Sequence, residues 1–258
     1  MDIFNLNYAE FERFLFVFFR VGALVLFVPI FGSRQVPSSM KIGFILFLSI
    51  AIFPLVEGRP LPEPRGIFDL AIFLISDVTI GLGIAFITRL IFTAVQIAGT
   101  VVDFQMGFGV VNVIDPQTDT QVSVTAQFHN IVAVLIFLAV DAHHFILQAI
   151  VESFLIINPA EISFADITPG YMLHLFSGTF TTAVKIAAPI MAILFFLSVG
   201  LGLVARTVPQ MNVFIVGFPL QIGVGLLMVG LSLSFFSVLV QQQMYDLPGK
   251  LMGFLWAL

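Results

Sequence analysis

Long apolar runs separated by short polar breaks make up most of the chain. The runs lie at residues 14–30, 42–56, 67–102, 131–140, 145–157, 176–204 and 213–240. A lipid hydrocarbon core about 30 Å thick is crossed by about 20 helical residues. The pattern therefore predicts an all-α integral membrane protein with about six long hydrophobic helices, together with short broken helices in hairpins.

Several of these runs have unusual lengths. Residues 42–56 are short for a free-standing span, which favours burial among neighbouring helices. Residues 67–102 are too long for one perpendicular crossing, so part of that helix is expected to leave the membrane. Asp141-Ala-His-His144 separates 131–140 from 145–157, which predicts two short helices in a hairpin. The clearest loop is 57–66, where three prolines and four charges exclude a helix.

Composition supports the membrane interpretation and excludes several classes of function. Hydrophobic residues make up 59% of the 258 positions, charged residues only 10%, and Phe alone occurs 31 times. A water-soluble domain of this size needs about a quarter of its residues charged. The net charge of −5 is dispersed and no basic run occurs, so we expect no nucleic-acid partner. Without Cys the chain has no disulfide, thiolate zinc site or iron-sulfur cluster.

The basic residues do not orient the helices. A six-crossing arrangement places Arg13, Arg59, Arg65 and Lys250 on one side of the membrane and Arg34, Lys41, Arg89 and Arg206 on the other. The positive-inside rule needs an excess on one side, and here the two sides are equal. Either the number of crossings differs, or the chain is not a conventional serpentine inserted alone in the bilayer. The irregular helix lengths favour the second alternative.

The sequence carries no motif of an enzyme or of a cofactor site. Intramembrane zinc proteolysis needs H-E-x-x-H, and serine or aspartyl proteolysis needs G-x-S-G or G-x-G-D; none occurs. A nucleotide-binding G-x-x-x-x-G-K-[ST] loop is also missing. His143 and His144 are adjacent and would point about 100° apart on a helix, so we expect them not to chelate one metal. We therefore predict no catalytic residue, no cofactor and no metal.

Four charged residues interrupt the apolar runs: Arg20, Asp77, Arg89 and Lys185. An unpaired charge at membrane depth costs several kcal/mol, so each of these residues is expected to have either a partner or a function. One interpretation is a proton or ion pathway, as in a transporter. The other is pairing between helices, with Arg89 and Lys185 extending to an interface. The second is favoured, because a proton relay normally uses several carboxylates and Asp77 is the only convincing one.

The segment from Asp103 to Pro116 is too rich in glycine for a stable helix and too apolar for an ordinary solvent loop. Within it Gly107 and Gly109 free the backbone, while Phe104, Met106 and Phe108 offer soft, bulky side chains to a constriction. An apolar constriction blocks water without a charged latch. The alternative is a buried connection between helices that never touches a substrate.

Three groups of residues, taken together and in order, resemble the FliR family of flagellar type III export proteins. They are Arg20-Val-Gly-Ala-Leu-Val-Leu-Phe-Val-Pro-Ile-Phe31 with Val36-Pro37, Asp103-Phe-Gln-Met-Gly-Phe-Gly109, and Arg206-Thr-Val-Pro-Gln-Met-Asn212 followed by Gly217-Phe-Pro219. The resemblance covers essentially the whole chain. One departure is Asp141-Ala-His-His144, which stands where a turn containing glycine is expected.

The resemblance implies one export-gate subunit over residues 1–258, FliP-like over 1–170 and FliQ-like over the helical hairpin 171–258. Such a subunit is non-catalytic and is wound with FliP and FliQ subunits into a hetero-oligomeric helical assembly around a pore. It would contact FlhB and membrane lipid and pass exported flagellar proteins through the bacterial inner membrane at the flagellar basal body. The alternative function is a secondary transporter or another polytopic membrane carrier, for which we detect no inverted repeat.

The resemblance also assigns two segments. It implies that Phe104, Met106, Gly107, Phe108 and Gly109 belong to a plug that seals the pore. By analogy with FliQ-type loops, Arg206, Pro209, Gln210 and Asn212 would face the cytoplasm and meet FlhB, with Pro209 ending the preceding helix. A plain connector between two helices is the alternative for this second segment.

Overall fold

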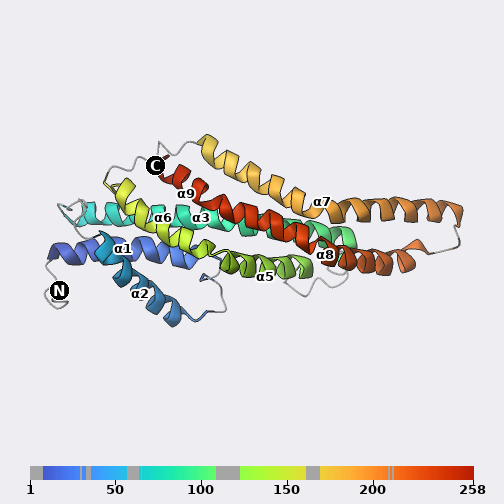
Figure 1. Ribbon diagram of the computed structural model, residues 1–258, viewed down its shortest axis with the longest axis horizontal. Helices are drawn as coiled ribbons and strands as arrows, with labels where there is room; N and C mark the ends of the chain where they lie inside the picture. The colour runs from blue at the N-terminus through green and yellow to red at the C-terminus, as the bar shows by residue number, and fades with distance from the viewer. Residues whose placement is uncertain are drawn as a thin grey trace. The chain divides into compact units, whose positions relative to one another are not determined.

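The computed structural model is built of helices, and the residues that it describes contain no strand (Figure 1). Those residues are 8–29, 31–32, 36–56, 64, 66–108, 123–160, 169–208, 210 and 212–258. The helices are α1 Tyr8–Phe27, α2 Ser38–Val56, α3 Ile67–Met106, α5 Val124–Ala139, α6 Ala142–Ile156, α7 Pro169–Thr207, α8 Val213–Tyr245 and α9 Leu247–Leu255. The all-α fold expected from the apolar runs is confirmed.

The described residues include four helices that are long and apolar enough to cross a membrane, or five if α5 and α6 count as one broken span. This is fewer than the six expected. Helix α1 is not among the candidate spans. It has 20 residues, but four of them are charged: Glu10, Glu12, Arg13 and Arg20. By contrast, the prediction of an overlong third helix is confirmed, because α3 runs unbroken for 40 residues.

Three local expectations need correction. Helix α2 begins at Ser38, directly after Pro37, and is 19 residues long, so it is not short. Only 22% of its most apolar stretch is buried, so it is not enclosed by neighbours within this chain. Helix α3 continues through residues 103–106, because this stretch contains neither glycine nor proline before Gly107. At Val140 and Asp141 the chain bends by 67° and does not reverse, so α5 and α6 form a broken helix and not a hairpin.

The chain divides into two compact units, each assembled from separated stretches of sequence. The first unit comprises residues 1–90, 141–175 and 245–258. Within it α2 packs against both α1 and α6, and α6 packs against α9. Gly81 brings the α3 backbone onto the carbonyl of Arg20, where a Cβ would collide with α1. At the start of α7, the Tyr171 hydroxyl donates to the Lys250 carbonyl over 2.6 Å. Burial raises the pKa of Tyr171, which keeps that donor protonated.

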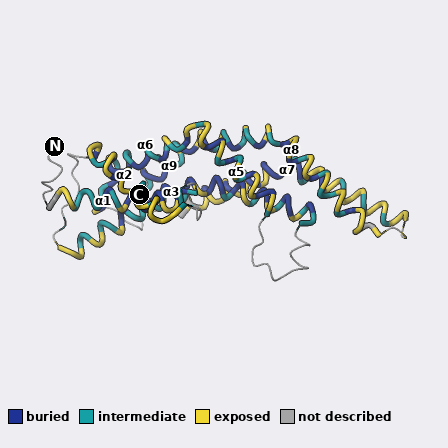
Figure 2. The backbone as a smooth tube through the Cα atoms, turned by 90° about the horizontal axis from the view of Figure 1, so that it is seen from below, coloured by how far each residue is buried: buried dark blue, intermediate teal, exposed yellow. Residues whose placement is uncertain are grey.

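The second unit comprises residues 91–140 and 176–244. Gly99 of α3 lies against the backbone of Ala126 in α5, and the rings of Phe92 and Phe137 are 5.8 Å apart. The buried His129 ring stands 4.7 Å from the ring of Phe236 in α8. Much of α7 and α8 is nevertheless exposed towards the loop that joins them (Figure 2). The core of this unit therefore lies away from that loop, where the buried parts of α7 and α8 are found together with those of α3 and α5.

Candidate functional site

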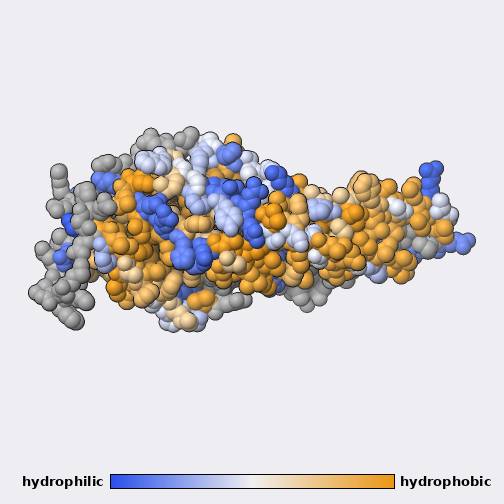
Figure 3. All heavy atoms as spheres, viewed as in Figure 1, coloured by the Kyte–Doolittle hydropathy of each residue, from blue (hydrophilic) through white to orange (hydrophobic). Residues whose placement is uncertain are grey.

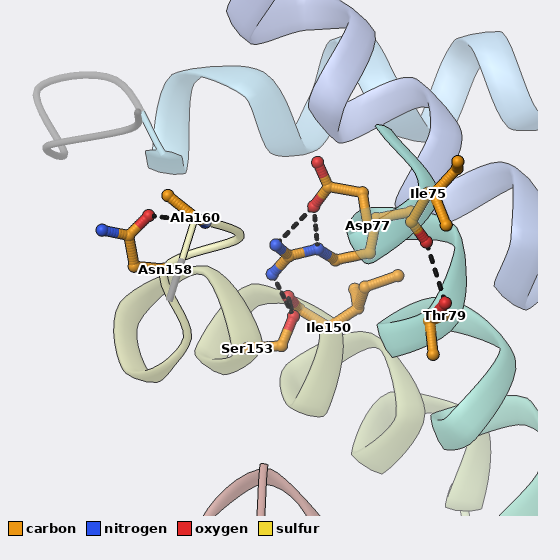
Figure 4. A network of polar contacts seen from close by, with 8 residues as sticks. Ile75, Asp77, Thr79, Ile150, Ser153, Asn158 and Ala160 are labelled. Carbon is orange, nitrogen blue, oxygen red and sulfur yellow. Dashed lines mark hydrogen bonds and ion pairs between the residues drawn. The ribbon is translucent and has the colours of Figure 1, made fainter. Parts of the chain in front are cut away.

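A buried ion pair occupies the first compact unit. Arg20 and Asp77 are both fully buried, and Arg20 Nε donates to Asp77 Oδ1 over 2.7 Å, with Nη2 contacting the same oxygen. On its other side the guanidinium donates through Nη1 to Ser153 Oγ over 2.9 Å. Figure 4 shows Asp77 and Ser153 on opposite sides of the guanidinium that joins them. One arginine thus links α1, α3 and α6.

The rest of the guanidinium is enclosed by its neighbours. The ring of Phe154 lies 3.7 Å from Arg20 Cζ, close enough for a cation–π contact. Ser153 Oγ in turn donates to the Ile150 carbonyl over 2.7 Å, so the hydroxyl is oriented to accept from Arg20. A buried charge that loses its partner typically destabilises a fold by about 3–5 kcal/mol. These contacts make Arg20 and Asp77 a structural pair.

The other two charged candidates lie elsewhere. Arg89 is exposed on α3, and Lys185 is exposed on α7 in the second unit. Neither side chain is part of the Arg20 network in the residues that the structure describes. Of the four interrupting charges, Arg20 and Asp77 are therefore the two that the described residues show in contact with each other.

The end of α3 separates the plug candidates from one another. Phe104 is 77% exposed, whereas Met106 is fully buried with its thioether against Gly225 of α8. The helix ends at Gly107, whose φ of 89° suits glycine, and the ring of Phe218 occupies the place of a Cβ there. Phe108 is half-buried, and Gly109 lies outside the described residues. Met106 in this arrangement anchors the segment, and Phe104 faces outward.

Asp103 ties the two flanks of this segment together. Its Oδ2 accepts from Ser123 Oγ and from the Thr125 amide, the latter over 3.2 Å. Ser123 Oγ accepts from the Ala126 amide over 3.0 Å, which is an N-cap of α5. A carboxylate at a helix N-terminus is also favoured by the helix dipole. We name the pair of Asp103 and Ser123 the stem clamp, because it joins the end of α3 to the start of α5.

The remaining candidates lie at the end of α7 and in the loop that joins it to α8, with Arg206 in the last turn of α7 itself. Arg206, Gln210 and Asn212 are exposed, while Pro209 lies outside the described residues. Helix α7 ends at Thr207, as expected for a helix that runs into a proline. Polar residues gather at this end of the two helices and apolar residues along their sides (Figure 3). Ser198 and Gln221, joined over 3.2 Å, connect α7 and α8.

The sequence of the chain matches the model of one protein family, described as bacterial export proteins, family 1, over residues 11–247. The chain belongs to this family. The match contains all three groups of residues that carry the FliR resemblance, from Arg20 to Pro219. It also contains the buried ion pair and the stem clamp.

Relatives of this export protein include flagellar biosynthetic proteins and a Yop proteins translocation protein. It is 40% identical to the flagellar biosynthetic protein FliR of Bacillus subtilis, over 90% of each chain. Identity to the FliR protein of Escherichia coli K12 is 29%, over 80% of this chain and 78% of that one. Identity to Yop proteins translocation protein T of Yersinia pestis is 26%, over 81% of each chain. The FliR resemblance is confirmed, and the matches support a membrane component of a flagellar type III export apparatus.

Sequence reasoning missed several residues of this export protein's interior. Ser153 is 133 positions from Arg20 in the sequence, and Phe154 is the next residue. No local pattern predicts contacts over such a separation. Ser123 could have been found, since a serine before an apolar run is an N-cap signal. The expectation for His143 and His144 is wrong in its geometry. Their ligand atoms lie within 4.8 Å of each other and of Asp141, because both rings turn towards that carboxylate.

Proposed function

We propose that this chain is a non-catalytic structural and gating subunit of the flagellar type III export apparatus. With FliP and FliQ subunits, and in contact with FlhB, it forms the pore through which unfolded flagellar proteins cross the inner membrane at the basal body. The observation that carries the proposal is the amount of apolar surface that the chain leaves uncovered. In three of its four candidate spans only 22% of the most apolar stretch is buried.

Close packing against other subunits is supported by exposed glycines on α7 and α8. Exposed glycines that have no described atom of another element within 4 Å of a Cβ position are Gly200 and Gly202 on α7 and Gly223 and Gly230 on α8. Small residues on a membrane helix let a second helix approach closely, whereas lipid gains nothing from them. Neighbouring helices of an assembly are therefore a better environment for these faces than lipid alone.

The gating part of the proposal rests on the end of α3. Phe104 is exposed, Phe108 is half-buried, and Gly107 turns the chain between them. We assign these residues and Gly109 to an apolar constriction, which excludes water and ions by its lack of polar groups. Met106 and the stem clamp would hold the constriction on the rigid helices α3, α5 and α8.

The partner-facing part rests on the last turn of α7 and the loop that joins it to α8. Arg206, Gln210 and Asn212 expose polar side chains at the end of two apolar helices, where an aqueous surface is required. We assign them, with Pro209, to the contact with FlhB on the cytoplasmic side. We also assign residues 1–170 to a FliP-like part and 171–258 to a FliQ-like hairpin.

A secondary transporter is less well supported by the site. Among the described residues, the buried carboxylates are Asp77 and Asp103. Asp77 is paired with Arg20, and Asp103 holds the N-terminus of α5. Neither is left to carry a proton from one side of the membrane to the other.

Native mass spectrometry of gently solubilised membranes tests the proposal. The expected result is a complex that contains this chain together with FliP-type and FliQ-type subunits and has no turnover of its own. The chain found alone, or supporting substrate-driven ion flux as a single protein in liposomes, would overturn it. Membranes from cells without the FliP subunit are the control, because the same complex should then be missing.

A further inference from the structure

Asp141, His143 and His144 form a compact group at the start of α6. One ligand atom from each lies within 4.8 Å of the other two, and in the described part of the chain this is the one group of three such side chains. Asp141 Oδ1 is 4.0 Å from His143 Nε2 and 3.8 Å from His144 Nδ1. Both rings therefore face the same carboxylate oxygen.

The backbone at Asp141 produces this convergence. Its φ of 54° and ψ of 28° are left-handed, and among the described residues it is the one non-glycine residue with a positive φ. In this conformation the carboxylate makes no capping bond to the amides of α6. It is directed at the imidazoles of the first helical turn instead, whose ring centroids are 4.2 Å apart.

We propose that Asp141, His143 and His144 form a binding site for a divalent transition-metal ion of the Zn²⁺ class. Two imidazoles and one carboxylate are a common ligand set for such ions, with water in the open positions. Zn²⁺ lies about 2.0–2.2 Å from each ligand atom, so ligands of a tetrahedral site are about 3.4 Å apart. The distances of 3.8 and 4.0 Å to Asp141 exceed this by about half an ångström, and all three ligand atoms lie within 4.8 Å of one another, so side-chain rotations would have to bring them closer around an ion.

The exposure and the charge of the three side chains determine how an ion reaches the site and which cation it favours. The side chains of Asp141 and His144 are 69% and 67% exposed, so an ion reaches them without opening the fold. The positive end of the α6 dipole opposes a cation at this position. The carboxylate of Asp141 therefore supplies most of the electrostatic attraction. A single carboxylate suits neither Mg²⁺ nor Ca²⁺, which prefer sites built largely from oxygen ligands.

The consequence for the chain is a stabilised bend. Asp141 lies at the break between α5 and α6, and an ion held by all three side chains would offset the cost of its left-handed backbone. The site is independent of the Arg20 network and of the stem clamp, since it shares no residue with either.

The test uses the full chain, purified without a polyhistidine tag and titrated with Co²⁺. Ligand-field absorption of Co²⁺ reports coordination by protein side chains, and competition with Zn²⁺ gives the affinity for that ion. We expect saturable binding of one ion per chain. His144→Ala and Asp141→Gly should each weaken binding at least as much as loss of an outer-shell partner, which costs about 10- to 100-fold. Glycine adopts the left-handed conformation readily, so Asp141→Gly removes the ligand while preserving the turn.

His174→Ala is the matched control, since it removes an exposed histidine of α7 that lies outside the group. This variant should bind Co²⁺ as the unchanged chain does. Absence of saturable binding would overturn the proposal. Binding that survives in both His144→Ala and Asp141→Gly would overturn it as well, because the ion would then be held elsewhere.

Discussion

Met106 lies against Gly225, with its thioether in the space that a side chain at position 225 would need. Met106 is fully buried, so this contact joins α3 to α8 inside the second compact unit. A protein interior is packed too densely to accept added methyl groups at such a place without movement.

Gly225→Val should therefore destabilise the chain by about 1–3 kcal/mol, the usual cost of overpacking. Thermal unfolding of the purified protein in one detergent measures the effect. Gly223→Val is the matched control, because no atom lies within 4 Å of a Cβ at that exposed position. Equal melting temperatures for the two variants would show that Met106 does not fill the space.

Asp77→Asn should cost about 3–5 kcal/mol, because it leaves the Arg20 guanidinium buried without its counter-charge. The double variant Arg20→Met with Asp77→Leu should be much less harmful, since well-packed apolar residues often replace a buried ion pair without loss. Thermal unfolding and the amount of protein in the membrane measure both. Lys185→Gln, at an exposed position, is the control. A double variant as unstable as Asp77→Asn would contradict this account of the pair.

Asp103→Ala and Ser123→Ala should each lower the free energy of unfolding, and their effects should not be additive. Loss of an N-cap serine costs about 1 kcal/mol, and a buried group left without its partner costs about 1–3 kcal/mol. The two residues share one hydrogen bond, so the double variant should be less unstable than the sum of the two single variants. A double-mutant cycle of unfolding free energies measures the coupling. Strict additivity would mean that the stem clamp does not act as a unit.

Phe104→Ala combined with Phe108→Ala should make resting cells that carry the assembled apparatus leaky to small ions or dyes. The reason is that the proposed constriction depends on bulky apolar side chains. Phe180→Ala is the control, because Phe180 is an exposed aromatic on α7 far from this segment in sequence. Dye uptake is the measurement. Unchanged permeability in an assembled complex would remove these residues from the gate.

The predictions that succeeded depended on local sequence. The apolar run after residue 66 predicts α3, and the position of Pro209 agrees with the end of α7 at Thr207. Gly107 and Gly109 predict an irregular segment that begins at Asp103. Both glycines come after Met106 in the sequence, so they do not prevent α3 from continuing to that residue. The family resemblance predicts a turn containing glycine at Asp141-Ala-His-His144, and the structure has a left-handed aspartate there.

The parts of the site that could not be predicted are contacts between distant residues. The sequence offers Asp77 as the one convincing carboxylate within the apolar runs, but it does not say which basic residue contacts it. The choice is made by Gly81, which brings α3 against the Arg20 backbone and places Asp77 one turn away on the same helix. Likewise, only the left-handed backbone of Asp141 turns two adjacent histidines towards one carboxylate. Both results depend on backbone geometry that residue types alone do not specify.

The sparsely buried α7 and α8 also affect what a melting temperature of this chain means. Apolar faces that the described part of the chain leaves exposed must be covered by detergent when the protein is purified alone. Anything that binds the folded form shifts its unfolding by mass action. The melting temperature is therefore a joint property of chain and micelle, and variants can be ranked only within a single detergent at a fixed concentration. In the complete apparatus, the same helices should unfold at a temperature set by their neighbours.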